Sequence, residues 1–176
     1  NRGSDVEALA DYDRAIARDP QRGDAYFGAG LTFMKRREYT AAARSLGEAS
    51  RLMPDVAAVH HQHAMALQKS DRTPEALEAL DMAIAVDPAH LDSYLHKARI
   101  LSQRHQWEDS LAVLEAARPH DPEDRSLAQR FSDRMKVCDW TDHDAEIAEI
   151  LRRLAAGSDD VAAFNTLAHL HDAGLQ

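Results

Sequence analysis

The stretch YTAAARSLGEASRLMP, residues 39–54, has a counterpart one period later in TPEALEALDMAIAVDP, residues 73–88. Each stretch ends in a proline, and further prolines stand at positions 20 and 122, so that four prolines follow one another at intervals of 34 residues. A regular proline spacing can arise by chance unless other residue types recur at fixed distances from the proline. Such recurrence is present, and it predicts a 34-residue structural repeat.

Small and large side chains alternate in step with these prolines. Twelve, eight and five residues before them stand Ala8, Tyr12 and Ala15; Ala42, Leu46 and Ala49; Ala76, Leu80 and Ala83; Ser110, Leu114 and Ala117. Spacings of four and three place such residues on one face of a helix, where small side chains let a neighbouring helix approach around one large side chain. A second stripe, further before the proline, consists of Tyr26, Gly30 and Phe33; His60, Ala64 and Leu67; Tyr94, Ala98 and Leu101. Each period therefore predicts two helices.

The two stripes resemble the tetratricopeptide repeat (TPR), a 34-residue helix-turn-helix unit. The resemblance covers residues 5 to about 137 and implies an all-α fold, a right-handed superhelix of antiparallel helix pairs, or TPR solenoid. The array is expected to occupy residues 1–137, followed by a two-helix extension or junction to a further domain at 138–176. Its parts are a half repeat at 1–22, full repeats at about 23–54, 57–88 and 91–122, and a half repeat at 124–137.

Local signals predict where some helices begin and end. Ser4 followed by Glu7 forms a capping box, which predicts a helix that begins at Asp5. Pro119 is expected to shorten the last regular helix around Ala116, because proline lacks the amide that the helix requires.

Two amphipathic helices are expected in the extension. The apolar face of the first consists of Ile147, Ile150, Leu151 and Leu154. The second is expected at about 160–171, with Val161, Phe164, Leu167 and Leu170. These faces break the 34-residue period.

The composition excludes several classes of protein. The net charge is -9 and the isoelectric point is about 5.5, which disfavours nucleic acid as a partner because such binding depends on clustered cations. No apolar run reaches the roughly 20 residues needed to cross a bilayer, so no membrane partner is expected. Cys138 is the single cysteine, which leaves no internal disulfide and favours a reducing, cytoplasmic location.

A second, shorter resemblance follows the repeats. The stretch VCDWTDHD, residues 137–144, is similar to the junction after the repeats in O-linked N-acetylglucosamine transferases and their SPINDLY-like relatives, and FNTLA, residues 164–168, is similar to the segment that leads into their catalytic lobes. The resemblance implies a parent protein that transfers a sugar from a UDP-sugar to Ser or Thr, with catalytic lobes beyond Gln176. The asparagine ladder of those enzymes is missing, because the matching positions hold Gly28, Gln62 and His96, and then Leu31, Met65 and Arg99.

The first helix of each pair is expected to line a concave groove that binds a peptide. The groove positions collect Phe27, Leu31, Met34 and Lys35; His61, Met65, Gln68 and Lys69; Leu95, Arg99, Ser102 and Gln103. Apolar side chains beside cations in an acidic protein suit a peptide with hydrophobic anchors and some negative charge. The alternative is that Phe27, Leu31 and Met65 only complete the packing between repeats. The Lys-x-x-x-Asn pattern with which chaperone-binding relatives clamp a terminal carboxylate does not occur in these helices.

Other candidate sites are weaker. His60, His61 and His63 lie within one turn, but His60 takes the position of Tyr26 and Tyr94 and is expected to pack in the interior, so we predict no metal site. Cys138, next to Trp140, is expected to be buried and structural rather than reactive. The sequence contains no motif for catalysis or phosphate binding, and we predict no catalytic residues and no cofactor.

The function predicted from the sequence is therefore a noncatalytic protein-interaction scaffold with a peptide or protein partner in the groove. The alternative is the substrate-recognition arm of a SPINDLY-like protein O-glycosyltransferase, which differs by requiring two nucleotide-sugar lobes after Gln176. Self-association through apolar stripes on the terminal helices is a third hypothesis.

Overall fold

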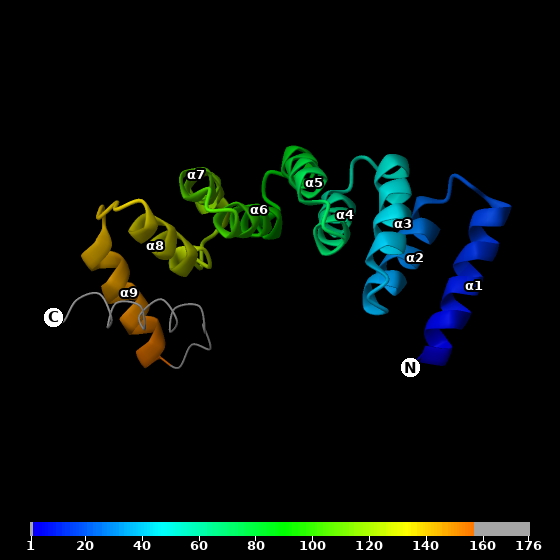
Figure 1. The fold of residues 1–176 in the computed structure, drawn as a ribbon, viewed down its shortest axis with the longest axis horizontal. Helices are drawn as coiled ribbons and strands as arrows, with labels where there is room; N and C mark the ends of the chain where they lie inside the picture. The colour runs from blue at the N-terminus through cyan, green and yellow to red at the C-terminus, as the bar shows by residue number, and fades with distance from the viewer. Residues whose placement is uncertain (1, 157–176) are drawn as a thin grey trace. The chain divides into compact units, whose positions relative to one another are not determined.

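The computed structural model describes residues 2–156, which fold into helices joined by short turns (Figure 1). No strand occurs in this range, so the predicted all-α class is confirmed. The chain divides into two compact units, the first ending at Tyr94 and the second beginning at Leu95, and each is described by itself.

Five complete helices and the start of a sixth make up the first unit. They are α1 (Arg2–Arg18), α2 (Gly23–Lys35), α3 (Tyr39–Leu52), α4 (Ala57–Lys69), α5 (Thr73–Val86) and the first four residues of α6 (Leu91–Gln103). Helix α2 pairs with α3 and α4 pairs with α5, while α1 packs on α2 and α3 packs on α4 (Figure 1). Helices therefore pack in chain order, as expected for repeats that bury their apolar faces on their neighbours.

The small-large-small stripes form the core of this unit. In the first full repeat Ala42, Leu46 and Ala49 are fully buried, and the equivalent residues of the next repeat, Ala76, Leu80 and Ala83, are buried to the same extent. The facing stripe is also interior: Ala64 and Leu67 are buried, and His60 places Nε2 2.8 Å from the carbonyl oxygen of Pro54. The prediction that His60 packs in the interior is confirmed.

A left-handed residue ends the first helix of each full repeat. Arg37, Asp71 and His105 have φ angles of 63°, 61° and 61°, and they stand 34 residues apart in the sequence. In each turn the next residue donates its amide to a carbonyl five residues back, as Glu38 does to Phe33 at 2.9 Å. This is the Schellman motif, in which a residue with positive φ lets the chain turn while the last helix carbonyls keep hydrogen bonds.

Two local predictions fared differently. Helix α1 already includes Arg2, so Ser4 lies inside the helix and the predicted capping box with Glu7 is wrong. The effect of Pro119 is confirmed, because α7 ends at Ala117 and a turn of 3₁₀-helix follows.

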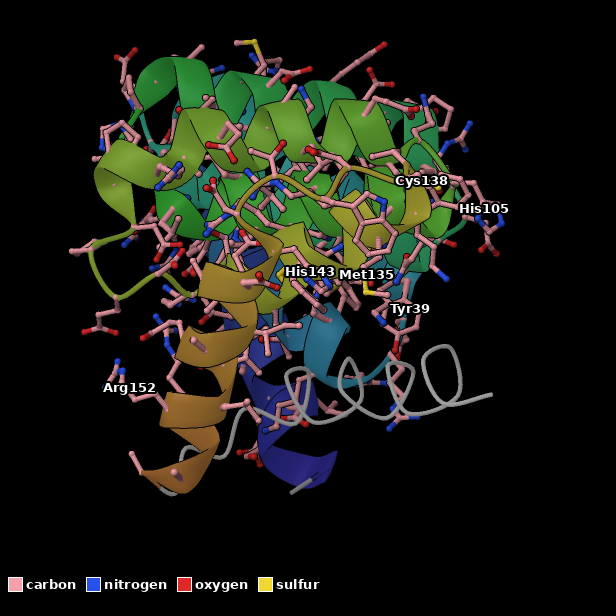
Figure 2. All side chains as sticks on the ribbon, turned by 90° about the vertical axis from the view of Figure 1, so that its left-hand side faces the viewer. Tyr39, His105, Met135, Cys138, His143 and Arg152 are labelled. Atoms are coloured by element: carbon pink, nitrogen blue, oxygen red, sulfur yellow. The ribbon has the colours of Figure 1, made fainter. Side chains whose placement is uncertain are left out.

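The second unit contains the rest of α6, α7 (Trp107–Ala117), the 3₁₀ turn η1 (Arg118–His120), α8 (Leu127–Lys136) and α9 (His143–Ala155). Its apolar core joins α8 to α9 through Leu127, Ala128, Phe131 and Ile150, with Met135 and Ile147 packed against them. The ring of His143 stacks on that of Phe131 with centroids 5.5 Å apart, and Figure 2 labels both His143 and Met135.

The predicted apolar face of α9 is only partly correct. Ile147 and Ile150 face the core, but Leu151 is 51% exposed. The side chain of Leu154 and the helix predicted at about 160–171 lie outside the described residues.

The predicted burial of Cys138 is wrong. Cys138 is exposed, and the neighbouring indole of Trp140 is 58% exposed. Cys138, labelled in Figure 2, has a φ of 56° and donates its amide to the carbonyl of Met135, so it is the turning residue after α8 rather than part of the apolar core.

Candidate peptide-binding face

The predicted groove residues of the first unit share one face of α2 and α4. Spacings of four and three along each helix place them on one stripe, beside the stripe that packs into the core. The two helices also contact each other directly. We call this surface the α2/α4 face; it consists of Phe27, Leu31, Met34, Lys35, His61, Met65, Gln68 and Lys69.

The apolar members of this face stay accessible at their positions. Leu31 is 37% exposed, and Phe27, Met34 and Met65 are half-buried, whereas the core leucine Leu46 is fully buried. Several apolar side chains that stay partly accessible together on one face are a feature of binding surfaces, whereas a single exposed apolar side chain is not.

The two lysines of the face differ in their surroundings. The ammonium of Lys35 lies 2.6 Å from the carboxylate of Asp5 on α1. This hydrogen bond from Lys35 holds the pKa of Asp5 below its usual value. Lys69 is exposed, and no ion pair joins it to another described residue. Only Lys69 therefore offers an uncompensated positive charge on this face.

Helix α1 covers one end of the face. A β-carbon on Gly28 would clash with the Tyr12 side chain, 2.6 Å from its hydroxyl oxygen, so the Tyr12 side chain packs directly on the backbone of α2. Sequence reasoning placed Tyr12 only on the core stripe. The signal for this contact was the glycine itself, which stands where the next two repeats carry Gln62 and His96.

His61 is engaged with the next turn of the first unit. Its ring centroid lies 5.3 Å from that of His90, at an interplanar angle of 57°. His90 in turn places Nδ1 2.8 Å from the hydroxyl of Ser93. His61 therefore takes part in packing as well as lining the face.

The remaining candidates, Leu95 and Arg99, lie on α6 in the second unit. Leu95 is half-buried and Arg99 is exposed. By helix spacing, eight of the ten predicted residues belong to the α2/α4 face of the first unit, and the other two belong to the second unit.

The second unit contains a buried polar network that the sequence did not reveal. Asp133 is 1% exposed, and its carboxylate accepts hydrogen bonds from Ser102 at 2.7 Å, from Ser110 at 2.6 Å and from Gln129 at 3.1 Å. Ser110 occupies the repeat position that is alanine in the earlier repeats. Its hydrogen bond to Asp133 accounts for a serine at this position.

A separate group of charged side chains joins α8 to its neighbours in the second unit, including α9. The guanidinium of Arg130 lies 2.6 Å from the carboxylate of Asp124, and that of Arg134 lies 3.0 Å from both Glu115 and Glu146. Burial raises the pKa of Glu146, although the nearby arginines oppose the rise. Arg134 pairs with carboxylates on both α7 and α9, so this arrangement of charges is that of a structural network.

Metal-ligating residues do not converge in the described part of the chain: no group of three or more His, Cys, Asp or Glu side chains there is placed to hold a metal ion. Among residues 2–156 no helix has both the length and the apolar character of a membrane span.

Two family models, each described as a tetratricopeptide repeat, match residues 7–56 and 67–132, which together make up more than half of the chain. Neither match reaches the stretch at 137–144 that resembles the glycosyltransferase junction.

Curated relatives are similar over part of their length. The chain is 25% identical over 121 residues to the Hsp70-Hsp90 organizing protein of Triticum aestivum, and 29% identical over 120 residues to the U-box domain-containing protein 70 of Oryza sativa subsp. japonica. These matches cover 69% and 68% of this chain but only 21% and 15% of the relatives.

Solved structures share the fold. The chain superposes on YrrB, described as a TPR protein with an unusual peptide-binding site, with a TM-score of 0.71 at 18% identity, covering 94% of this chain and 84% of the other. It superposes on the MamA protein with a TM-score of 0.75 at 16% identity, covering 99% and 89%. At these identities the likeness concerns the fold alone.

Proposed function

Because the chain belongs to the tetratricopeptide repeat family, we propose that it is a noncatalytic scaffold that binds a peptide or protein partner on the α2/α4 face. The observation that carries this proposal is the accessibility of Leu31 on α2, which is apolar and 37% exposed beside the half-buried Phe27 and Met34. Solved relatives of the same fold include a protein described as having a peptide-binding site, which agrees with this use of the fold.

The chemistry of the face defines the ligand class. Leu31, Met34 and Met65 offer apolar contacts, and methionine adapts to ligands of irregular shape. Gln68 adds an amide that can bond a peptide backbone, and Lys69 adds one cation. A helical or extended peptide with apolar anchors and an acidic residue beside them fits this set.

A peptide-array experiment with the double variant Leu31→Asp/Met65→Asp tests the proposal. The two aspartates would remove apolar contacts from the middle of the face and repel acidic ligands. We therefore expect the amount of peptide captured to fall at least tenfold. The matched control is Val6→Asp/Met82→Asp, which places the same charges at apolar side chains that are 56% and 51% exposed outside the face. Persistent binding by a double variant that is still helical by circular dichroism would refute the proposal.

A second candidate function is the substrate-recognition arm of a SPINDLY-like protein O-glycosyltransferase. It depends on the stretches at 137–144 and 164–168, of which the second lies outside the described residues. The deciding observation is the sequence that follows Gln176 in the parent gene. Two nucleotide-sugar-binding lobes there would favour this candidate, and any other domain would remove it.

Self-association is the third hypothesis. Val6 on α1 and Leu151 on α9 are apolar side chains that are each more than half exposed. Sedimentation velocity over a hundredfold range of concentration tests it: a rising sedimentation coefficient that Val6→Asp or Leu151→Asp abolishes would support self-association, and a constant monomer value would refute it.

A further inference from the structure

A basic hollow lies in the first unit, where the turn after α2 meets the end of α4. Its volume is about 590 Å³. The turn and the start of α3 supply Arg37, Glu38, Tyr39, Thr40, Ala41 and Arg44, and the end of α4 supplies Lys69, Ser70 and Asp71. Tyr39, the first residue of α3, is labelled in Figure 2.

Three cations line this hollow without a partner in the described structure. Arg37, Arg44 and Lys69 are exposed, and no carboxylate of residues 2–156 pairs with any of them. Many other arginines of the first unit are compensated, for example Arg51 by Glu48 at 3.0 Å and Arg72 by Glu75 at 3.1 Å. In a chain with a net charge of -9, three uncompensated cations from separate elements at one hollow need an explanation.

The carboxylates at the hollow do not cancel this charge. Glu38 is paired with Arg36 at 2.7 Å, outside the lining. Asp71 is the other acidic residue of the lining, so three cations stand against two carboxylates, one of which Arg36 already neutralises. The local excess of positive charge attracts an anion.

The start of α3 adds neutral donors to the cations. No side chain caps this helix, and its first turn contains no acidic residue. The hydroxyl-bearing residues Tyr39 and Thr40 belong to the same lining. These groups are complementary to an anion that the cations hold in place.

We propose that the basic hollow formed by Arg37, Arg44 and Lys69 binds the phosphoryl group of a phosphoserine or phosphothreonine in the partner peptide. A phosphate monoester carries a charge of about -1.5 to -2 and three acceptor oxygens, which match two guanidinium forks and an ammonium better than a single carboxylate does. A single hollow on an acidic chain does not suit a continuous polyanion such as nucleic acid.

This inference deepens the proposed function and rests on it, because the phosphoryl group is carried by the peptide. Lys69 connects the two sites, since it belongs both to the α2/α4 face and to the hollow. A peptide whose apolar residues occupy the face would then place a modified side chain at the hollow, and phosphorylation of the partner would raise its affinity.

The test is an NMR titration of the ¹⁵N-labelled chain with three probes of defined chemistry. The probes are the blocked pentapeptide Ala-Ala-phosphoSer-Ala-Ala, its glutamate counterpart Ala-Ala-Glu-Ala-Ala, and inorganic phosphate. We expect saturable shifts of the amide signals of Tyr39, Thr40 and Ala41 with the phosphopeptide, at an affinity at least tenfold higher than with the other two probes. Equal affinity for glutamate would overturn the assignment to a phosphoryl group, and equal affinity for inorganic phosphate would overturn the assignment to a peptide.

Matched variants separate the site from general charge. Arg37→Asn/Arg44→Gln removes two cations, and asparagine tolerates the positive φ at residue 37. The affinity for the phosphopeptide should fall at least tenfold. Arg14→Gln/Arg51→Gln makes the same change in net charge at exposed arginines outside the hollow, and it should change the affinity less than twofold. An equal loss in both variants would overturn the proposal.

The two proposals fail in different ways. The variant Leu31→Asp/Met65→Asp, which tests the face, should leave the shifts of Tyr39, Thr40 and Ala41 with the short phosphopeptide unchanged. If array binding survives in that variant, the face proposal fails. If the short phosphopeptide does not bind the original chain, the hollow proposal fails.

Discussion

A β-carbon on Gly30 would stand 2.5 Å from Cγ of Leu46, so helices α2 and α3 approach each other as closely as a glycine permits. The backbone nitrogen of Leu46 would lie 3.3 Å from the same β-carbon, which means that moving the leucine side chain alone would not relieve the crowding. The distance between the two helices of the first full repeat therefore depends on the contact of Gly30 with Leu46.

Gly30→Ala is expected to destabilise the first unit by about 1 to 3 kcal/mol, because overpacking exceeds the gain in helix propensity. The measurement is urea unfolding followed by circular dichroism. Gly47→Ala is the control, since a β-carbon there would meet only the end of the His63 side chain at 3.2 Å. Equal stability of both variants would show that the α2–α3 contact is looser than described.

Arg37→Gly and Asp71→Gly are each expected to raise the free energy of unfolding by about 0.5 to 1 kcal/mol. Their positive φ angles strain residues that carry a β-carbon, and glycine removes this strain. Thermal melts of the single variants give the measurement. Arg36→Gly provides the comparison, because residue 36 has a φ of -80° and glycine there should destabilise the chain.

Asp133→Asn is expected to destabilise the second unit by about 1 to 3 kcal/mol. The amide nitrogen that replaces one oxygen cannot accept a hydrogen bond, so the bond that Ser102 or Ser110 donates to that oxygen is lost, although Ser110 keeps the carbonyl of Ala98 as a second acceptor. Urea unfolding of this variant is compared with that of Glu123→Gln, which changes an exposed carboxylate with the same loss of charge. Similar losses in both variants would contradict the network's role.

Two carboxylates on α9 should give pH dependences of opposite sign. Burial raises the pKa of Glu146 above its ordinary value of 4.5, so its stabilising contribution is present below pH 4.5 and is lost as the pH rises through the raised pKa. Hydrogen bonds from Arg152 and then Arg153 lower the pKa of Glu149 to about 2, so its contribution is present above pH 4.5 and is lost as the pH falls towards 2. Figure 2 shows Arg152 extending away from the ribbon of α9.

The measurement is the free energy of unfolding between pH 2 and pH 8 for Glu146→Gln and Glu149→Gln. Relative to the original chain, Glu146→Gln should gain stability as the pH rises above 4.5. Glu149→Gln should lose relative stability between about pH 2 and pH 4.5. Parallel profiles for the two variants would contradict the opposite shifts.

Periodic features were predictable from the sequence, whereas contacts between distant side chains were not. The stripe of Ala42, Leu46 and Ala49 could be predicted because helix geometry alone determines which residues share a face. The pair of Lys35 with Asp5 depends on how α1 docks and on side-chain rotamers, which spacing does not define. The hydrogen bonds to Asp133 could not be predicted for the same reason, because they join side chains from three different helices.

The repeated turns were missed for a different reason. Arg37, Asp71 and His105 share a left-handed backbone conformation that glycine adopts most often. Because the three side chains differ chemically, the sequence did not show that these positions are equivalent. The exposed position of Cys138 was also missed, because its neighbour Trp140 suggested burial, whereas Cys138 lies in the turn after α8 and both residues are exposed.

The equivalent turns thus carry an arginine, an aspartate and a histidine in the same backbone conformation, at Arg37, Asp71 and His105. Because backbone hydrogen bonds alone form each turn, the side chain at the turning residue is not needed for the turn. Substitution at these positions, by evolution or by design, can therefore change the surface charge of one repeat at a time without changing how the helices pack.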